Sequence, residues 1–121
     1  MPIFNLNCLI RGEDRKRIFS IEIGDDKTIG ALKKSIKEEK KNAFKNVDAD
    51  TLVLWEVSTR IDQDFKKRVD NLVLDDENSL MPDEELGDVF SHKPPATKHL
   101  HIIVDQPLDG AYERIWVFIP S

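Results

Sequence analysis

The sequence predicts an α+β domain in which a mixed β-sheet packs on one main amphipathic helix, with short additional helices. Residues 28–41, TIGALKKSIKEEKK, predict the helix, because Ile29, Leu32 and Ile36 recur at i, i+3 and i+7 and share one face. The segments on either side alternate apolar and polar residues, as half-buried strands do. A helix of this length is marginal alone in water, so its apolar face needs a sheet as partner.

Two strands are predicted before the helix. Residues 3–10 alternate from Phe4 onward, and residues 17–23 alternate in the same way after a turn signal at Gly12. These two segments predict a β-hairpin. Thr28 is then expected to cap the helix, since its hydroxyl can accept from the free backbone N–H groups of the first turn.

The next apolar segment runs from Leu52 to Val57 and consists almost entirely of β-forming residues. Apolar side chains on both faces predict a strand in the interior of the sheet. Leu52 and Leu54 are expected to face the helix, which places Trp55 on the opposite face with Val53 and Val57. This outer face forms an apolar patch.

The sequence leaves three alternatives for what covers that patch: the apolar C-terminal tail around Trp116, a helix around Phe65, or a partner protein. Cover within the chain is the more common arrangement. The remaining elements are shorter, and we expect a helix within 62–72, a short strand at 73–74, a brief helix within 82–90 and a strand at 100–104.

Strand, strand, helix, strand, short helical pieces and strand is the element order of a β-grasp domain. By analogy with ubiquitin-like folds, the first and last strands are expected to lie side by side at the centre and to run parallel. The helix-on-sheet arrangement follows from the sequence pattern, whereas the strand order follows from the analogy.

The composition fits one globular domain. The chain has 121 residues and a formal net charge of −5, which argues against nucleic acid as the main partner. Cys8 is the single cysteine, so no internal disulfide is possible. The first residues lack the features of a conventional signal peptide, and no run approaches the roughly 20 apolar residues of a membrane span.

Catalytic chemistry finds little support in the sequence. Cys8 with His92, His99 or His101 would supply a thiol and a base, but Cys8 falls on the apolar face of its strand, where cysteine behaves as a small hydrophobe. No phosphate-binding glycine loop and no nucleophile elbow is found. The sequence therefore predicts a protein without catalytic residues or a cofactor.

A metal site is the next possibility. His99 and His101 share one side of a strand at i, i+2, and Asp75 or Asp83 would have to complete the site from a loop. The acids from Asp75 to Glu77 lack the spacing of a calcium loop. A solvent-facing histidine pair is the ordinary interpretation, and no metal is predicted.

Five sequence blocks resemble the N-terminal ubiquitin-like domain of the Crinkler effector family, in its fungal form. The resemblance extends over residues 1–107, and the apolar tail 108–121 follows with no predicted placement. The blocks are FNLNCLIRG at 4–12, IGALKKSIK at 29–37, LVLWEV at 52–57, LMP with LGDVF between 80 and 90, and HLHIIVDQP at 99–107.

The resemblance implies a non-enzymatic N-terminal domain of a secreted effector. Its expected role is delivery or targeting to the cytoplasm or nucleus of a host cell, and binding to host proteins. The family's delivery element maps onto the segment 52–57, which reads LVLWEV and resembles the fungal form, so the oomycete delivery motif is not literally present. The implied interaction strand consists of Leu52, Leu54, Trp55 and Val57, and a secondary basic surface of Lys33, Lys34, Lys37 and Lys41.

Two other hypotheses remain open. One is an intracellular ubiquitin-like adaptor that signals within the producing cell, and the other is an enzyme that uses Cys8. A conjugated modifier is the weaker form of the first, since the sequence ends in Ile119, Pro120 and Ser121 rather than in a glycine pair. A homodimer formed through the apolar tail is also possible.

Overall fold

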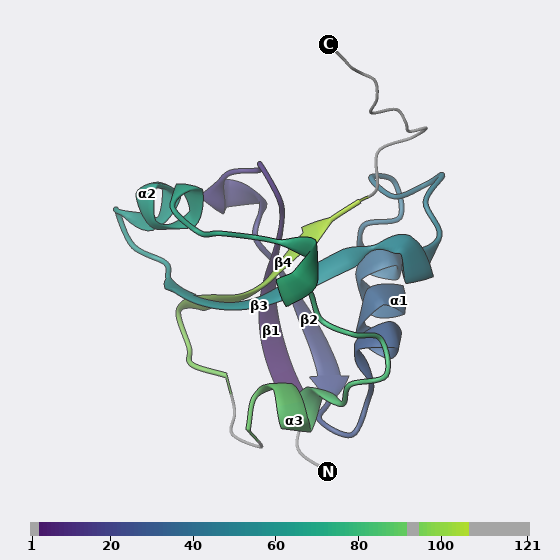
Figure 1. Ribbon diagram of the computed structural model, residues 1–121. Helices are drawn as coiled ribbons and strands as arrows, with labels where there is room; N and C mark the ends of the chain where they lie inside the picture. The colour runs from purple at the N-terminus through teal and green to yellow at the C-terminus, as the bar shows by residue number, and fades with distance from the viewer. Residues whose placement is uncertain (1–2, 92–94, 107–121) are drawn as a thin grey trace.

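The computed structural model describes residues 3–91 and 95–106 (Figure 1). Its strands and helices follow the predicted order, with single 3₁₀ turns between them. The strands are β1 (Ile3–Ile10), β2 (Phe19–Gly24), β3 (Val53–Arg60) and β4 (His99–Asp105). The α-helices are α1 (Ile29–Glu39), α2 (Phe65–Asp70) and α3 (Leu86–Val89), and the 3₁₀ turns are η1 (Arg15–Arg17), η2 (Ala49–Thr51) and η3 (Asp76–Asn78).

The four strands form one mixed sheet in the order β2-β1-β4-β3. β1 pairs antiparallel with β2, and β3 pairs antiparallel with β4. The first and last strands, β1 and β4, lie side by side at the centre and run parallel, with Cys8 opposite Ile102 and Ile10 opposite Val104. This is the arrangement of an α+β ubiquitin-like grasp fold, and it confirms the predicted fold class.

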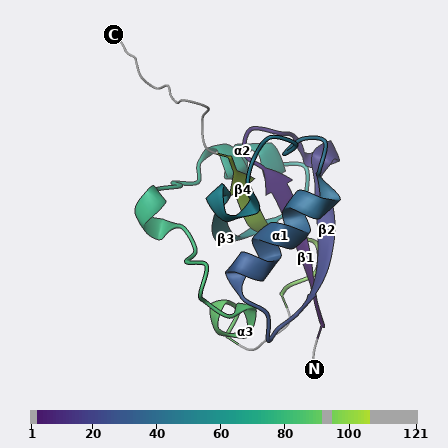
Figure 2. The same cartoon turned by 90° about the vertical axis from the view of Figure 1, so that its right-hand side faces the viewer.

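α1 packs its apolar face on one side of the sheet (Figure 2). Ile29, Leu32 and Ile36 are fully buried there, as their spacing predicts. Together they belong to a helix-side core that consists of Phe4, Leu6, Cys8, Ile21, Ile23, Ile29, Leu32, Ile36, Phe44, Leu52, Leu54, Leu86, Ile102 and Val104. The sheet and α1 therefore stabilise each other by burying a common apolar surface.

The first turn of α1 has partners for all of its free backbone N–H groups. Ala31 donates to the Thr28 hydroxyl at 3.2 Å, which confirms the predicted cap. Ile29 and Gly30 donate to the carbonyl oxygens of Glu84 at 2.8 Å and Pro82 at 3.0 Å. The segment predicted to start a helix at Pro82 is thus used to close α1, and α3 begins only at Leu86.

The other face of the sheet carries a second apolar cluster, the outer core. It consists of Leu9, Trp55, Val57, Phe65, Leu100 and Ile103. α2 covers this face, on the side of the sheet away from α1 (Figure 1). Leu72 and Leu74 also pack there. The sequence predicted a short strand at 73–74, but the structure has no regular element at these residues.

β3 lies at an edge of the sheet, so the prediction of an interior strand was wrong. The strand is apolar on both faces because the helix-side core and the outer core each cover one of them. A strand can therefore be buried on two faces without having two neighbours. Part of its free edge is closed by Leu80, whose backbone N–H donates to the carbonyl of Leu54 at 2.8 Å.

No helix in the described part of the chain is long and apolar enough to cross a membrane.

Candidate functional site

The four residues of the implied interaction strand are buried. Leu52 and Leu54 lie in the helix-side core and Trp55 and Val57 in the outer core, as the predicted facing requires. The side chain of Trp55 is only 3% exposed. The apolar patch that the sequence predicted on the outer face is therefore not an open surface in this structure, and a partner can reach it only after α2 has moved.

α2 and the segment after it provide the cover over Trp55. Phe65 packs in the same cluster, and the indole Nε1 donates to the backbone carbonyl of Asp75 at 2.8 Å. The guanidinium carbon of Arg11 lies 5.5 Å from the centre of the indole ring, within the range of a cation–π contact. Cover by the Phe65 helix, one of the three predicted alternatives, is confirmed. The Trp116 tail lies outside the described residues.

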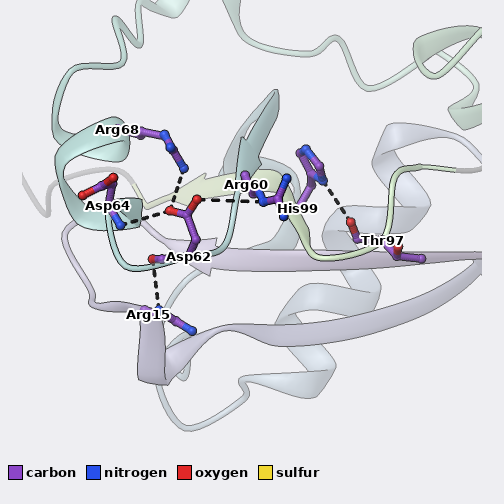
Figure 3. A network of polar contacts seen from close by, with 7 residues as sticks. All are labelled: Arg15, Arg60, Asp62, Asp64, Arg68, Thr97 and His99. Atoms are coloured by element: carbon purple, nitrogen blue, oxygen red, sulfur yellow. Dashed lines mark hydrogen bonds and ion pairs between the residues drawn. The ribbon is translucent and has the colours of Figure 1, made fainter.

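Asp62 fixes the turn between β3 and α2 (Figure 3). Its carboxylate accepts from Arg68 Nη1 of α2 at 2.6 Å and from the backbone N–H of Asp64 at 3.0 Å. Its backbone carbonyl accepts from Arg15 Nη1 of the η1 turn at 3.0 Å. The hydrogen bond from Arg68 holds the pKa of the Asp62 carboxyl below its usual value. This network connects α2 to the strand that it covers.

The secondary basic surface is smaller than the sequence predicted. Lys34 and Lys41 are exposed and Lys37 is partly buried, whereas Lys33 is only 6% exposed. Burial lowers the pKa of the Lys33 amine, and the charge of Asp50 opposes that shift. Including Lys33 in an open surface was wrong because α1 packs against the η2 turn on the side where Lys33 lies.

The structure gives no support to a thiol nucleophile. Cys8 is buried in the helix-side core, and its Sγ lies 3.6 Å from the carbonyl oxygen of Leu6. Burial raises the pKa of the thiol, which is the opposite of what an activated cysteine requires. Among the described residues, no group of three or more potential ligands is arranged to hold a metal ion.

His101 has a structural role that its spacing to His99 did not indicate. The ring is 3% exposed, and its Nε2 donates to the carbonyl of Ala96 at 2.6 Å. Its Nδ1 accepts from the backbone N–H of Asn7 at 2.9 Å. These partners require the neutral ring with its proton on Nε2. The prediction of a solvent-facing pair was therefore wrong for His101.

Protonating His101 is expected to destabilise the domain. Burial lowers the pKa of His101 from its usual 6.5, so the unfolded chain binds the proton more tightly than the folded one. The stabilising effect of the neutral ring is fully present above pH 6.5 and is lost as the pH falls below it. We expect the free energy of unfolding to fall by at most about 1.4 kcal/mol per pH unit there, measured by urea denaturation.

The matched variants are His101→Gln and His99→Gln. The first is expected to flatten the pH dependence between pH 7 and about pH 5. The second removes only the charge of His99, a minor cause of the lowered His101 pKa, and should therefore reduce the pH dependence much less. Equal slopes in the wild type and in His101→Gln would contradict this assignment.

A groove that the sequence analysis did not single out runs along β2. It has a volume of about 570 Å³, and it is lined from β1, β2 and α1 by Asn5, Ser20, Glu22, Ser35, Glu38 and Glu39. The sequence does not indicate this groove, since no local pattern shows that glutamates on a helix and on a strand face one another. Only the packing of α1 beside β2 brings them together (Figure 2).

Two comparisons with known proteins agree with the sequence resemblance. The family described as the Crinkler effector protein N-terminal domain matches residues 4–105. Crinkler effector protein 1 of the fungus Rhizophagus irregularis is 37% identical over 110 residues, which is 91% of this chain and 23% of that protein. The chain thus spans less than a quarter of that relative's length. Because the family match includes all four strands and α1, the chain belongs to the Crinkler effector N-terminal domain family.

Proposed function

We propose that this domain is a non-enzymatic targeting module of a Crinkler-type effector, which directs the protein into a host cell and there binds host proteins. The observation that carries the proposal is the family match over residues 4–105, which spans the described sheet except for Ile3. The burial of Cys8 supports the non-enzymatic part, since this thiol is neither accessible nor activated.

The geometry favours a role for the exposed faces rather than for the side chains of β3. Trp55 is covered by α2, so contacts with a partner are made through surfaces such as the lysines of α1. Three lysines, Lys34, Lys37 and Lys41, remain at least partly exposed there. We include them in the proposal as the basic surface that assists targeting.

Fusion of the full chain to a fluorescent reporter tests delivery. The fusion is expressed in a secreting fungus in contact with plant cells, and the reporter is imaged in the plant cytoplasm and nucleus. We expect signal inside the host cells, and none for the reporter alone. A reporter that never leaves the producing cell would contradict the delivery role and favour the adaptor hypothesis.

A charge variant tests the basic surface. Replacing Lys34, Lys37 and Lys41 by glutamine is expected to reduce the host signal, because the same fold then presents less positive charge on α1. The matched control replaces three exposed lysines elsewhere, namely Lys16, Lys45 and Lys67. An equal loss in both variants would show an effect of net charge and remove the α1 surface from the proposal.

A further inference from the structure

β2 leaves one edge of the sheet open. It pairs with β1 on one side only, because it stands at the end of the strand order. Among the described residues, no backbone hydrogen bond reaches residues 19–23 from the other side. The edge of β3 differs, because Leu80 donates to Leu54 there. An open edge presents free backbone donors and acceptors to an additional strand.

The groove described above lies along this open edge. Ser35, Glu38 and Glu39 of α1 form one wall, and Ser20 and Glu22 of β2 line the other side. The two elements lie side by side (Figure 2). Successive side chains of a strand point to opposite faces. A strand laid along β2 would therefore direct alternate side chains toward α1 and toward the opposite face of the sheet, where Ser20 and Glu22 are exposed.

The negative charge of the groove favours a partner with cationic side chains. Glu22, Glu38 and Glu39 are exposed, and none of them takes part in an ion pair within the described structure. The nearby Lys40 instead lies over the ring of Phe19, with its Nζ 4.9 Å from the ring centre. The carboxylates are thus available to a cationic side chain that lies in the groove.

Glu38 and Glu39 lie on a different flank of α1 from the buried Lys33, although Arg17, Lys40 and Lys41 line a neighbouring cavity with the same two glutamates. Lys33 lies on the flank near Asp50 and the η2 turn, whereas Glu38 and Glu39 line the groove beside β2. The acidic flank adjoins the open edge, so the backbone contacts and the charge attraction act on the same ligand. Complementary charge gives specificity in such a contact.

We propose that the β2 edge and its acidic groove bind an extended segment of a partner protein that carries lysine or arginine at alternate positions. The segment adds a fifth strand to the sheet through its backbone, and its cationic side chains lie against Glu38 and Glu39. This inference rests on the protein-binding part of the proposed function, and it gives that binding a location.

The direct test uses the full chain, labelled with ¹⁵N, and a nine-residue peptide that alternates valine and lysine. We expect saturable shifts of the β2 amides and of the amides of Glu38 and Glu39, with the β3 amides unchanged. A peptide with glutamate in place of lysine is expected not to bind. Methylating alternate backbone nitrogens of the lysine peptide should weaken binding at least about tenfold, because each lost N–H removes a strand hydrogen bond.

The variant Glu38→Gln with Glu39→Gln is expected to weaken binding of the lysine peptide about threefold to tenfold, the range for two exposed charge contacts. Glutamine preserves helix propensity, so α1 stays folded. The control Glu77→Gln with Asp83→Asn removes the same charge from exposed positions outside the groove. It should bind as the wild type does.

Three results would overturn the proposal: no binding at millimolar peptide, equal binding of the methylated peptide, or equal weakening in both charge variants. Shifts confined to the β3 amides would show that the peptide binds at the β3 edge instead of the β2 edge, and this result would also overturn the proposal. Peptide binding is measured without host cells, so its failure is distinguishable from a failure of delivery.

Discussion

Replacing Trp55 by alanine is expected to lower the free energy of unfolding by about 3–5 kcal/mol, the usual cost of truncating a buried large aromatic side chain. Trp55 is 3% exposed and packs in the outer core with Phe65. The substitution also leaves the carbonyl of Asp75 without the indole donor. Urea denaturation followed by circular dichroism measures the loss. A Trp55→Ala chain that no longer binds a partner would therefore report damage to the fold.

The control for this substitution is Val73→Ala, since Val73 is apolar and 75% exposed. Its free energy of unfolding should stay within about 0.5 kcal/mol of the wild type. Trp55→Phe keeps an aromatic ring but loses the indole donor, at about 1 kcal/mol, and part of the ring volume. Its cost should therefore lie between those of Val73→Ala and Trp55→Ala. If Trp55→Ala proves as stable as the wild type while partner binding is lost, the tryptophan is a recognition residue after all.

Replacing Phe65 by alanine is the second large expected effect, again about 3–5 kcal/mol if the outer core opens fully. Phe65 is the buried residue of α2, and six residues are too few to form a stable helix without packing. We expect α2 to detach and to uncover Trp55, while the helix-side core stays formed. Hydrogen exchange should then show α2 amides exchanging faster and α1 amides unchanged.

Lys67→Ala is the matched control, because Lys67 is exposed on the same helix. It should leave both exchange and stability within about 0.5 kcal/mol of the wild type. Unchanged protection of α2 in Phe65→Ala would show that the Asp62 network alone holds the helix. The variant also tests recognition by β3, since a partner that binds the Trp55 face must bind better once α2 is displaced.

The sequence predicts those parts of the fold whose signal is periodic and local. The apolar residues of α1 and the alternation in β1 identify the elements and the faces that they bury, and Thr28 identifies the start of the helix. The parallel pairing of β1 with β4 was expected only by analogy. No local pattern specifies which strands pair, because the pairing joins residues that are far apart in sequence, such as Cys8 and Ile102.

The errors have a common cause in tertiary packing. The outer face of β3 is apolar because α2 folds back over it, and the same pattern in a sequence also fits an interior strand or an exposed docking site. Lys33 is charged, so it was assigned to the surface, but it is only 6% exposed because α1 packs against the η2 turn. The groove beside β2 was missed because Glu22 and Glu38 are far apart in sequence.

The parallel pairing of β1 with β4 also determines when the domain can fold. The strand that completes the centre of the sheet, β4, is the last one described. The hydrogen bond from the backbone N–H of Asn7 to His101 can form only once His101, 94 positions later, is in place. Contacts of such long sequence separation slow folding, because the chain must close a large loop before they form. A chain that leaves a ribosome tunnel or another narrow passage with its N-terminus first consequently cannot complete the sheet until β4 has also left the passage.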